Sequence, residues 1–394
     1  MDRIPFTTKI GFTRDVILAG EAINAGVVAS TTWTREKYWK AWMRYANAVE
    51  IDPLLQHTDP LIRDMVLTTF AARVRQGYYG RGDQIKVQSV TDAMAAISKT
   101  IELAGYRSPV YRADNKYNLQ IERAVEGWRR EDPPAIPQLA VPVTVPIQMA
   151  EAANLIGSTF AKAIADLALI GFFYLLGVGE YTRPRVVSQN GKKVSATRTK
   201  QFRVKDVGFF KEGKVLPQRS PLEILLTADQ CTLKITNQKN GRMGETITHE
   251  TVQDSVHGPV TAVARRVHHI LSNGGNEDNL LSDYINEEGE WHTITASQMR
   301  HGVRTSVKIL KLDKNGIDPD LVGVHSLQAG GAMALKLQGV SDTIIQKQGR
   351  WTSMTFLQYI HNQIAHLSKT LSTKMTSTRL TFTNIANIEQ VPTQ

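Results

Sequence analysis

The sequence predicts a mainly α-helical protein with a small antiparallel β-sheet, in which a helical domain precedes a mixed α+β domain. Three observations support this fold class. Residues before 130 place apolar side chains at helical spacing, residues 131–147 hold five prolines that interrupt this pattern, and residues 230–249 alternate apolar and polar side chains around a turn signal. A chain of 394 residues also has the length of two domains.

The helical domain is predicted to span residues 29–130, after an arm at 1–28 whose periodicity is weak. Thr34 has a side chain that can cap a helix, and the apolar residues after it recur on one face of that helix. These residues are Tyr38, Trp42, Tyr45 and Val49. Further helices are expected at 60–77, 86–104 and 115–129. Four helices with short connections describe a small bundle.

Residues 131–147 form the predicted linker, because proline lacks a backbone N–H and cannot continue a helix. The mixed domain is predicted over 148–368, followed by a Thr- and Ser-rich tail over 369–394. Its expected elements are helices at 148–157 and 159–176, a strand at 204–210, a hairpin within 230–249 that turns at Asn240 and Gly241, and helices at 259–272, 295–312, 326–338, 341–348 and 353–367.

The charge of the chain favours a polyanionic partner. Lys and Arg number 47 against 37 Asp and Glu, which gives a formal net charge of +10. Most of this excess lies in residues 183–219, with eleven basic and two acidic residues. Such a run is either a solvated loop or a surface that releases counterions from a phosphate backbone.

The single cysteine, Cys231, excludes an intrachain disulfide and any zinc site with two thiolates. It indicates a reducing, intracellular compartment. No phosphate-binding loop and no ligand-rich cluster is present in the sequence, so we expect neither a metal nor a cofactor. Charged residues near the N-terminus argue against a signal peptide, and no uncharged apolar stretch is long enough to predict a membrane span.

Two segments near the C-terminus carry the most specific pattern. His325 opens the run His-Ser-Leu-Gln-Ala-Gly-Gly-Ala, and Gly349 opens Gly-Arg-Trp-Thr-Ser-Met-Thr-Phe-Leu-Gln-Tyr, which ends at Tyr359. Their order resembles the tyrosine recombinase (phage integrase) family, especially the Crypton-type variants of eukaryotic mobile elements. In that family a His-x-x-Arg box precedes Gly-His or Gly-Trp and a nucleophilic tyrosine. His325, Trp351 and Tyr359 match these positions.

Upstream segments extend the resemblance to about residues 30–370. The family's first box reads Arg-x-x-Glu; Glu180 matches its Glu, and Gly177 occupies the position of its Arg. The family's hairpin lysine corresponds to Lys239. The resemblance implies that the helical domain is a core-binding domain and that the mixed domain is of the tyrosine-recombinase catalytic type.

The resemblance also implies a chemistry. The hydroxyl of Tyr359 would attack a phosphodiester of DNA and form a phosphotyrosine bond, which the 5′ hydroxyl of a second strand then attacks. His325 and Trp351 would orient groups or donate hydrogen bonds, and Lys239 would protonate the leaving oxygen. Two arginines would normally neutralise the phosphate oxygens in the transition state.

Both arginine positions are substituted here. Gly177 has no side-chain donor, and Gln328, at the second position, can donate a hydrogen bond but carries no charge. Losing one such donor typically costs about 100- to 1000-fold in rate. The sequence therefore predicts impaired catalysis, as in a decayed mobile-element gene that keeps the fold and the DNA-binding surface.

Two other sources of charge remain open as alternatives. Arg183 or Arg185, just after the first box, could reach the phosphate instead. A second His-x-x-Arg occurs at His301 and Arg304, but it lies far before Tyr359 and no Ala-Gly-Gly helix follows it.

Seven basic residues are predicted to contact double-stranded DNA: Arg183, Arg185, Lys192, Lys193, Arg265, Arg266 and Arg350. By family resemblance we expect a homo-oligomer, a tetramer on DNA, without a membrane partner or a small-molecule substrate. The expected location is intracellular, and nuclear if the host is eukaryotic. The competing interpretations are a catalytically silent DNA-binding protein of the same fold and a helical protein-binding scaffold.

Overall fold

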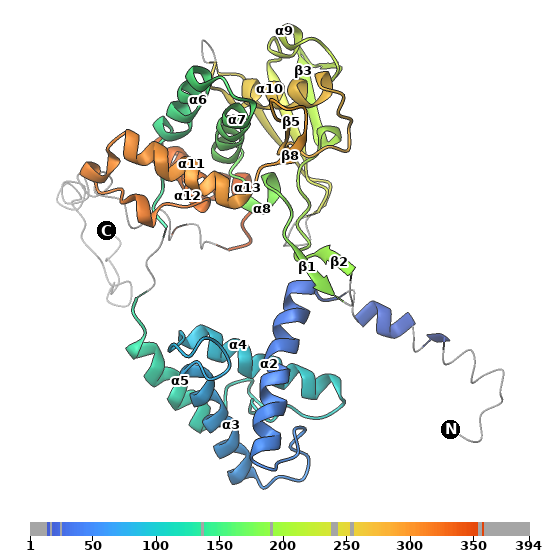
Figure 1. The fold of residues 1–394 in the computed structure, drawn as a ribbon, viewed down its shortest axis with the longest axis vertical. Helices are drawn as coiled ribbons and strands as arrows, with labels where there is room; N and C mark the ends of the chain where they lie inside the picture. The colour runs from blue at the N-terminus through green and yellow to red at the C-terminus, as the bar shows by residue number, and fades with distance from the viewer. Residues whose placement is uncertain are drawn as a thin grey trace, which may run out of the picture. The chain divides into compact units, whose positions relative to one another are not determined.

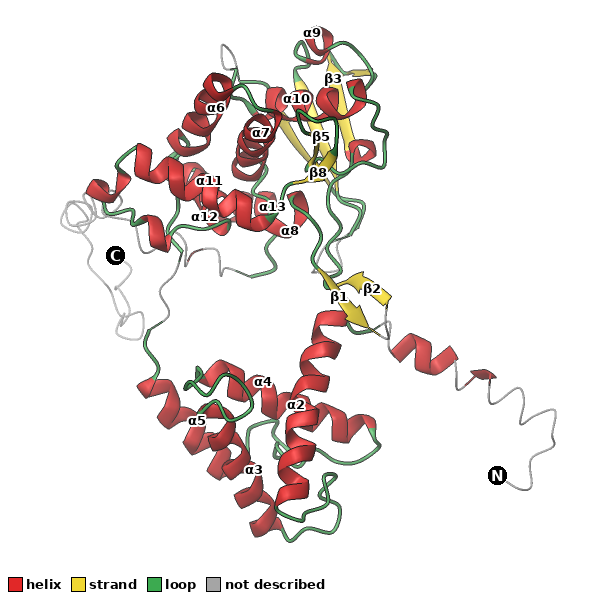
Figure 2. Ribbon diagram, in the orientation of Figure 1, coloured by secondary structure: helices red, strands yellow, loops and turns green. Residues whose placement is uncertain are grey.

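The computed structural model describes residues 14–15, 18–23, 26–134, 138–189, 192–237, 243–252, 256–353 and 357. The chain divides into two compact units (Figures 1 and 2). The first comprises Met1–Ala135 with Pro184–Arg198, and the second comprises Ile136–Arg183 with Thr199–Gln394. Helices predominate in both units and the strands form small antiparallel sheets, so the predicted mainly helical fold class is confirmed.

The first unit contains the four predicted helices, α2 (Ala29–Ala48), α3 (Pro60–Arg75), α4 (Val87–Leu103) and α5 (Leu119–Glu131). Its core is aromatic: Trp42 and Phe70 are fully buried, meet edge to face with ring centroids 5.2 Å apart, and the Trp42 indole donates to the carbonyl of Pro53. The predicted cap at Thr34 is wrong. Helix α2 begins five residues earlier, and the Thr34 hydroxyl donates to the carbonyl of Ser30 inside it.

The first part of the basic run, Pro184–Arg198, belongs to the first unit and contains a β-hairpin. Strands β1 (Val186–Gln189) and β2 (Lys192–Ser195) pair antiparallel, with Val186 opposite Ser195. The amide of Ser30 in α2 donates to the carbonyl of Ala196 just after the hairpin. The sequence analysis missed these strands, although Asn190 and Gly191 form the dipeptide that favours a tight hairpin turn.

The second unit contains helices α6 (Thr144–Ile156), α7 (Thr159–Phe173), α8 (Val178–Tyr181), α9 (Leu222–Leu225), α10 (Pro259–Ser272), α11 (Ala296–Ile309), α12 (His325–Leu337) and α13 (Asp342–Gly349). Three single 3-10 turns lie at Val204–Asp206, Leu312–Asn315 and Pro319–Leu321. The predicted extended linker is therefore shorter than expected, because α6 starts within it. Pro146 lies in the first turn of α6, where a backbone N–H would have no helical partner.

Four strands of the second unit form a sheet in the order β4-β3-β5-β6, all antiparallel: β3 (Val207–Lys211), β4 (Lys214–Leu216), β5 (Gln230–Lys234) and β6 (Thr246–Glu250). The pairing of β5 with β6 confirms the strands of the predicted hairpin. A two-stranded ribbon, β7 (Asp283–Ile285) and β8 (Trp291–Thr293), was not predicted. The predicted helix at 353–367 lies outside the described residues except for Leu357.

Helix α7 is the centre of this unit. Every residue from 163 to 172 is buried, which is expected for a helix that is apolar on all sides and covered by α6, α10 and α12 (Figure 2). Among the described residues, no helix is long and apolar enough to cross a membrane. Helix α12 approaches closely because Gly330 and Gly331 lack side chains: an added Cβ would lie 2.1 Å from the carbonyl oxygen of Val141 and 2.2 Å from that of Phe172, respectively.

Candidate functional site

Three separate segments of the second unit supply the described candidate residues. Gly177 and Glu180 lie at the start of α8, His325 and Gln328 lie in the first turn of α12, and Arg350 and Trp351 follow α13. In Figure 1, α8, α12 and α13 gather on one side of this unit. Lys239 and Tyr359 lie outside the described residues.

A buried ion pair joins the first and third segments. The guanidinium of Arg350 donates from Nη2 to Oε2 of Glu180 at 3.0 Å, and the two side chains are 4% and 9% exposed. Arg350 also donates to the backbone carbonyls of Tyr174 and Leu175, each at 3.2 Å. Its charge is therefore paired and hydrogen-bonded, as a buried guanidinium requires.

Arg350 shares acceptors with both Gly177 and Gln328. The carboxylate oxygen that it binds, Oε2 of Glu180, also accepts the backbone N–H of Gly177 at 2.6 Å. The carbonyl of Leu175, its other acceptor, also accepts Nε2 of Gln328 at 2.9 Å. The guanidinium of Arg350 is thus linked through shared acceptors to Gly177 and Gln328, the two residues that align with the family arginines in the resemblance.

The backbone at Gly177 leaves room for a side chain. Gly177 precedes α8 in an extended conformation, with φ −68° and ψ 143°. An added Cβ would meet only Oε2 of Glu180, at 3.5 Å, which is ordinary van der Waals contact. The glycine is therefore not required by the local fold.

His325 is the first residue of α12 and is exposed to solvent on one side. The protein around the rest of the ring lowers the pKa of His325, and the nearby charge of Arg300 lowers it further. Trp351 is half-buried, and an added Cβ at Gly349 would lie 2.2 Å from its indole, so the ring lies directly on that glycine.

The sequence analysis missed His249 on β6. Its ring lies edge to face on Tyr174, with centroids 4.6 Å apart, and Nε2 is 2.9 Å from Nε2 of Gln348. Burial lowers the pKa of His249 to about 4, so the imidazole is neutral at physiological pH and accepts from the Gln348 amide. No pattern in the sequence marks this residue, since its strand alternates like any half-buried strand.

The predicted DNA contacts lie in different surroundings. Arg183, Arg185 and Lys193 are exposed, and Lys192 is described only by its backbone in β2. Arg350 and Arg266 are 4% and 1% exposed, and the donors of Arg266 reach the carbonyls of Leu281 and Asp283. Buried and bonded in this way, both arginines act within the fold instead of presenting a surface to DNA.

Two other arginines have protein partners but stay partly exposed, with side chains 30% exposed at Arg265 and 36% at Arg304. Arg265 forms an ion pair with the buried carboxylate of Asp166 and donates to the carbonyl of Val256. Arg304, the alternative source of charge, donates to the carbonyls of Val322 and Asp320. Within the described residues no three His, Cys, Asp or Glu side chains converge as metal ligands.

A scan against protein-family models and a search of curated protein sequences matched nothing. Solved structures with a similar fold include a XerH site-specific recombinase bound to a palindromic difH substrate, 12% identical, covering 81% of this chain and 74% of that one, with a TM-score of 0.44. A Tn1549 transposon integrase in complex with transposon right end DNA is 10% identical over 78% of this chain and 85% of that one, with a TM-score of 0.41. A XerA recombinase is 13% identical over 91% and 97%, with a TM-score of 0.36.

Proposed function

We propose that this chain is a DNA-binding protein of the tyrosine-recombinase type, in which a tyrosine hydroxyl attacks a phosphodiester and the 5′ hydroxyl leaves. One observation supports the proposal most. The segments that carry the resemblance, far apart in sequence, meet through Arg350, which binds Glu180 of the first box and shares the Leu175 carbonyl with Gln328 of the second.

The proposed roles are those that the family resemblance implies. Tyr359 is the nucleophile, eight residues after Trp351. His325, whose pKa is lowered by burial and by the charge of Arg300, donates or accepts a hydrogen bond at the phosphate, and Lys239 protonates the leaving oxygen. Exposed basic residues of the 183–219 run, among them Arg183, Arg185 and Lys193, bind the backbone of DNA.

We further propose that strand cleavage is impaired. Arg350 shares acceptors with Gly177 and Gln328, but it already donates to Glu180 and to three backbone carbonyls, those of Tyr174, Leu175 and Gln348. A donor held by protein acceptors stabilises the fold more than it stabilises a transition state. The missing donors should cost at least about 100-fold in rate.

A covalent-capture experiment tests both proposals. Duplexes retained by the protein from a randomised pool are rebuilt with a nick, so that a cleaved strand cannot be rejoined, and adducts that resist denaturant are counted. We expect DNA retention but little adduct with the wild type, more adduct with Gly177→Arg combined with Gln328→Arg, and none when Tyr359→Phe is added.

The single variant Gly177→Arg separates the effect of this substitution from that of Gln328→Arg. Its first side-chain atom fits beside Glu180, whereas Gln328→Arg places a second cation beside Arg350 in a buried region. Thermal unfolding of each variant shows whether the fold survives. Abundant wild-type adduct contradicts the impairment, retention without adduct in every variant indicates a silent DNA-binding protein, and absence of retention contradicts the proposed function.

A further inference from the structure

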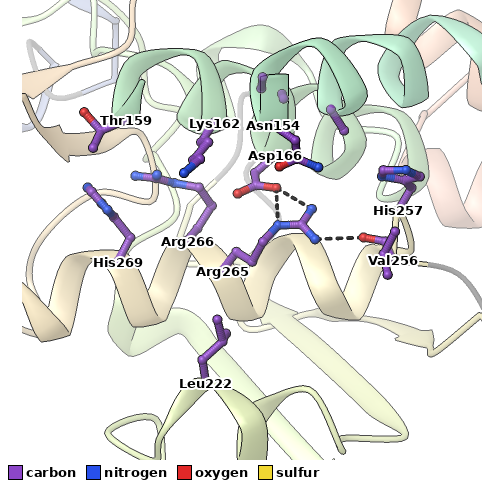
Figure 3. A pocket seen from close by; sticks show the side chains of 13 residues that line it. Asn154, Thr159, Lys162, Asp166, Leu222, Val256, His257, Arg265, Arg266 and His269 are labelled. Carbon is purple, nitrogen blue, oxygen red and sulfur yellow. Dashed lines mark hydrogen bonds and ion pairs between the residues drawn. The ribbon is translucent and has the colours of Figure 1, made fainter. Parts of the chain in front are cut away.

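A pocket of about 360 Å³ lies between α6, α7 and α10 in the second unit (Figure 3). Alanines at 150, 153 and 165 line its apolar part. Its volume lies at the lower end of the range for sites that enclose small molecules. Of the candidate recombinase residues that the structure describes, Arg265 and Arg266 line it.

Positively charged groups gather at one end of this pocket. Figure 3 shows the side chains of Lys162, Arg266 and His269 directed toward one another, from α7 and α10. Lys162 makes no ion pair within the described part of the chain and is exposed to solvent. Arg266 is 1% exposed and carries its charge into the pocket wall.

Carboxylates lie near this end: Asp166 lines the pocket, and burial lowers the pKa of Arg266 while the charges of Asp166 and Asp283 raise it, but the hydrogen bonds of both carboxylates go to other groups. Asp166 accepts two hydrogen bonds from Arg265, and Oε1 of Glu287 accepts the amide of Thr159 at 2.9 Å. The carboxylate of Asp283 accepts the Thr293 hydroxyl at 2.7 Å and the Leu280 amide at 2.9 Å. The two cations therefore face each other with no carboxylate hydrogen-bonded between them among the described residues.

His269 adds a neutral donor to this end. The amide of Ile285 donates to its Nε2 at 3.2 Å, so the proton of the neutral ring is on Nδ1. Burial lowers the pKa of His269 to about 4, and the charges of Arg266 and Lys162 act in the same direction. An anion between these groups would relieve their repulsion and would accept hydrogen bonds from Lys162 and from this Nδ1.

We propose that this pocket binds a small organic anion, whose carboxylate or phosphate accepts hydrogen bonds from Lys162 and His269 beside the buried charge of Arg266, and whose apolar body lies against the alanines of α6 and α7. The apolar part of the pocket excludes a fully hydrated polyanion such as DNA. The charged end excludes a purely apolar ligand, because two cations would lose their hydration without compensation.

Calorimetric titration of the full chain tests the site with four probes. Benzoate and phenyl phosphate combine an apolar ring with the two kinds of oxyanion, inorganic phosphate lacks the ring, and benzyl alcohol lacks the charge. We expect saturable binding of benzoate, phenyl phosphate or both, and the probe that binds more tightly identifies the oxyanion. Inorganic phosphate and benzyl alcohol should bind at least about tenfold more weakly. Equal binding of inorganic phosphate, or no binding of either ring-bearing anion at millimolar concentrations, overturns the proposal.

Lys162→Met is the variant that tests the charged end. The side chain is exposed, so the fold should persist, and the affinity for the preferred ring-bearing anion should fall about tenfold. Lys314→Met, which replaces an exposed lysine of the same unit that does not line the pocket, is the matched control and should bind like the wild type. Unchanged affinity in Lys162→Met contradicts the proposal.

The ring signals of His269 give a second measurement that does not depend on the variant. With the preferred anion bound, its pKa should rise from about 4, because burial and then the charges of Arg266, His268 and Lys162 lower it, and the anion offsets those charges. A pKa that stays unchanged while the anion is bound would place the anion elsewhere.

Discussion

Arg350 is the residue that holds the candidate site together. It adopts a positive φ of 58°, in the left-handed region that non-glycine residues rarely use. The same residue donates to Glu180 and to carbonyls at the end of α7, so buried hydrogen bonds offset the local strain. The main role of Arg350 is therefore to fix the geometry of the site, and these hydrogen bonds go to groups of the protein itself.

Removing the carboxylate of this pair should be costly. Glu180→Gln keeps the shape of the side chain but leaves the Arg350 charge buried without its counterion, so the free energy of unfolding should fall by about 3–5 kcal/mol. Urea unfolding of the full chain measures the change. Asp320→Asn is the control, because Asp320 is 83% exposed in its ion pair with Arg304 and should contribute less than about 1 kcal/mol. Equal losses in the two variants would contradict this view of Glu180.

His249 should make stability depend on pH. Its pKa is about 4 in the folded protein and near 6.5 in the unfolded chain, so the unfolded state binds a proton first as the pH falls. The contribution of the neutral ring is therefore complete above pH 6.5 and is lost between 6.5 and about 4, at most about 3 kcal/mol. His249→Gln should lose less stability than the wild type over this range, as urea unfolding at several pH values would show. Parallel pH profiles would contradict the buried, neutral state of the ring.

At the scale of elements, the packing of α12 on α7 places the second box next to the first. Gly330 and Gly331 allow the two helices to approach, and Gln328, two residues before them, reaches the carbonyl of Leu175 just after α7. The small residues after His325 are thus required for the packing of α12 on α7, and this packing sets the position of Gln328. Larger residues there would move the whole first turn of α12.

Gly330→Ala tests this packing. The new Cβ would lie 2.1 Å from the backbone oxygen of Val141, which cannot move without the chain, so the free energy of unfolding should fall by about 1–3 kcal/mol or more. Gly179→Ala in α8 is the control, since nothing lies within 4 Å of its added Cβ, and the change there should stay within about 0.5 kcal/mol. Denaturant unfolding compares them, and a neutral Gly330→Ala would show that α12 can shift freely.

At the scale of the whole molecule, the net charge of +10 is unevenly distributed, with the strongest basic run divided between the two units. Arg185 and Lys193 belong to the first unit through the β1–β2 hairpin, and Arg183 belongs to the second. Under the proposed function both units therefore offer exposed cations to a DNA backbone. The affinity should then fall steeply with salt.

The slope of log affinity against log salt measures how many phosphates are contacted. Lys193→Gln should reduce the magnitude of this slope by about one, because one phosphate contact is lost. Lys314→Gln, an exposed lysine outside the basic run, should leave the slope unchanged. A slope near zero in the wild type would point to a protein that does not bind DNA through its charge.

Local sequence patterns predicted an element correctly where the residues of that element alone set its ends. Helix α10 spans the predicted residues 259–272, because Pro259 begins it and an amphipathic pattern continues through it. The pairing of β5 with β6 followed from alternation around Asn240 and Gly241. Thr34 failed as a cap where a distant segment takes part: α2 begins at Ala29, and the amide of Ser30 in its first turn donates to the carbonyl of Ala196.

The sequence by itself determined the helical character, the basic surface and the spacing of the boxes, since each depends on residues that are neighbours in the chain. Only the tertiary structure decided which charged side chains are exposed and which are buried. Arg266 and Arg350 look like any other basic residues in the sequence, but burial turns both inward, onto backbone carbonyls and, for Arg350, onto Glu180. The reason is physical: a buried charge must find its partners, and apart from the Gln348 carbonyl, two residues before Arg350, those partners lie 15 to 176 residues away along the chain, where no local pattern can reveal them.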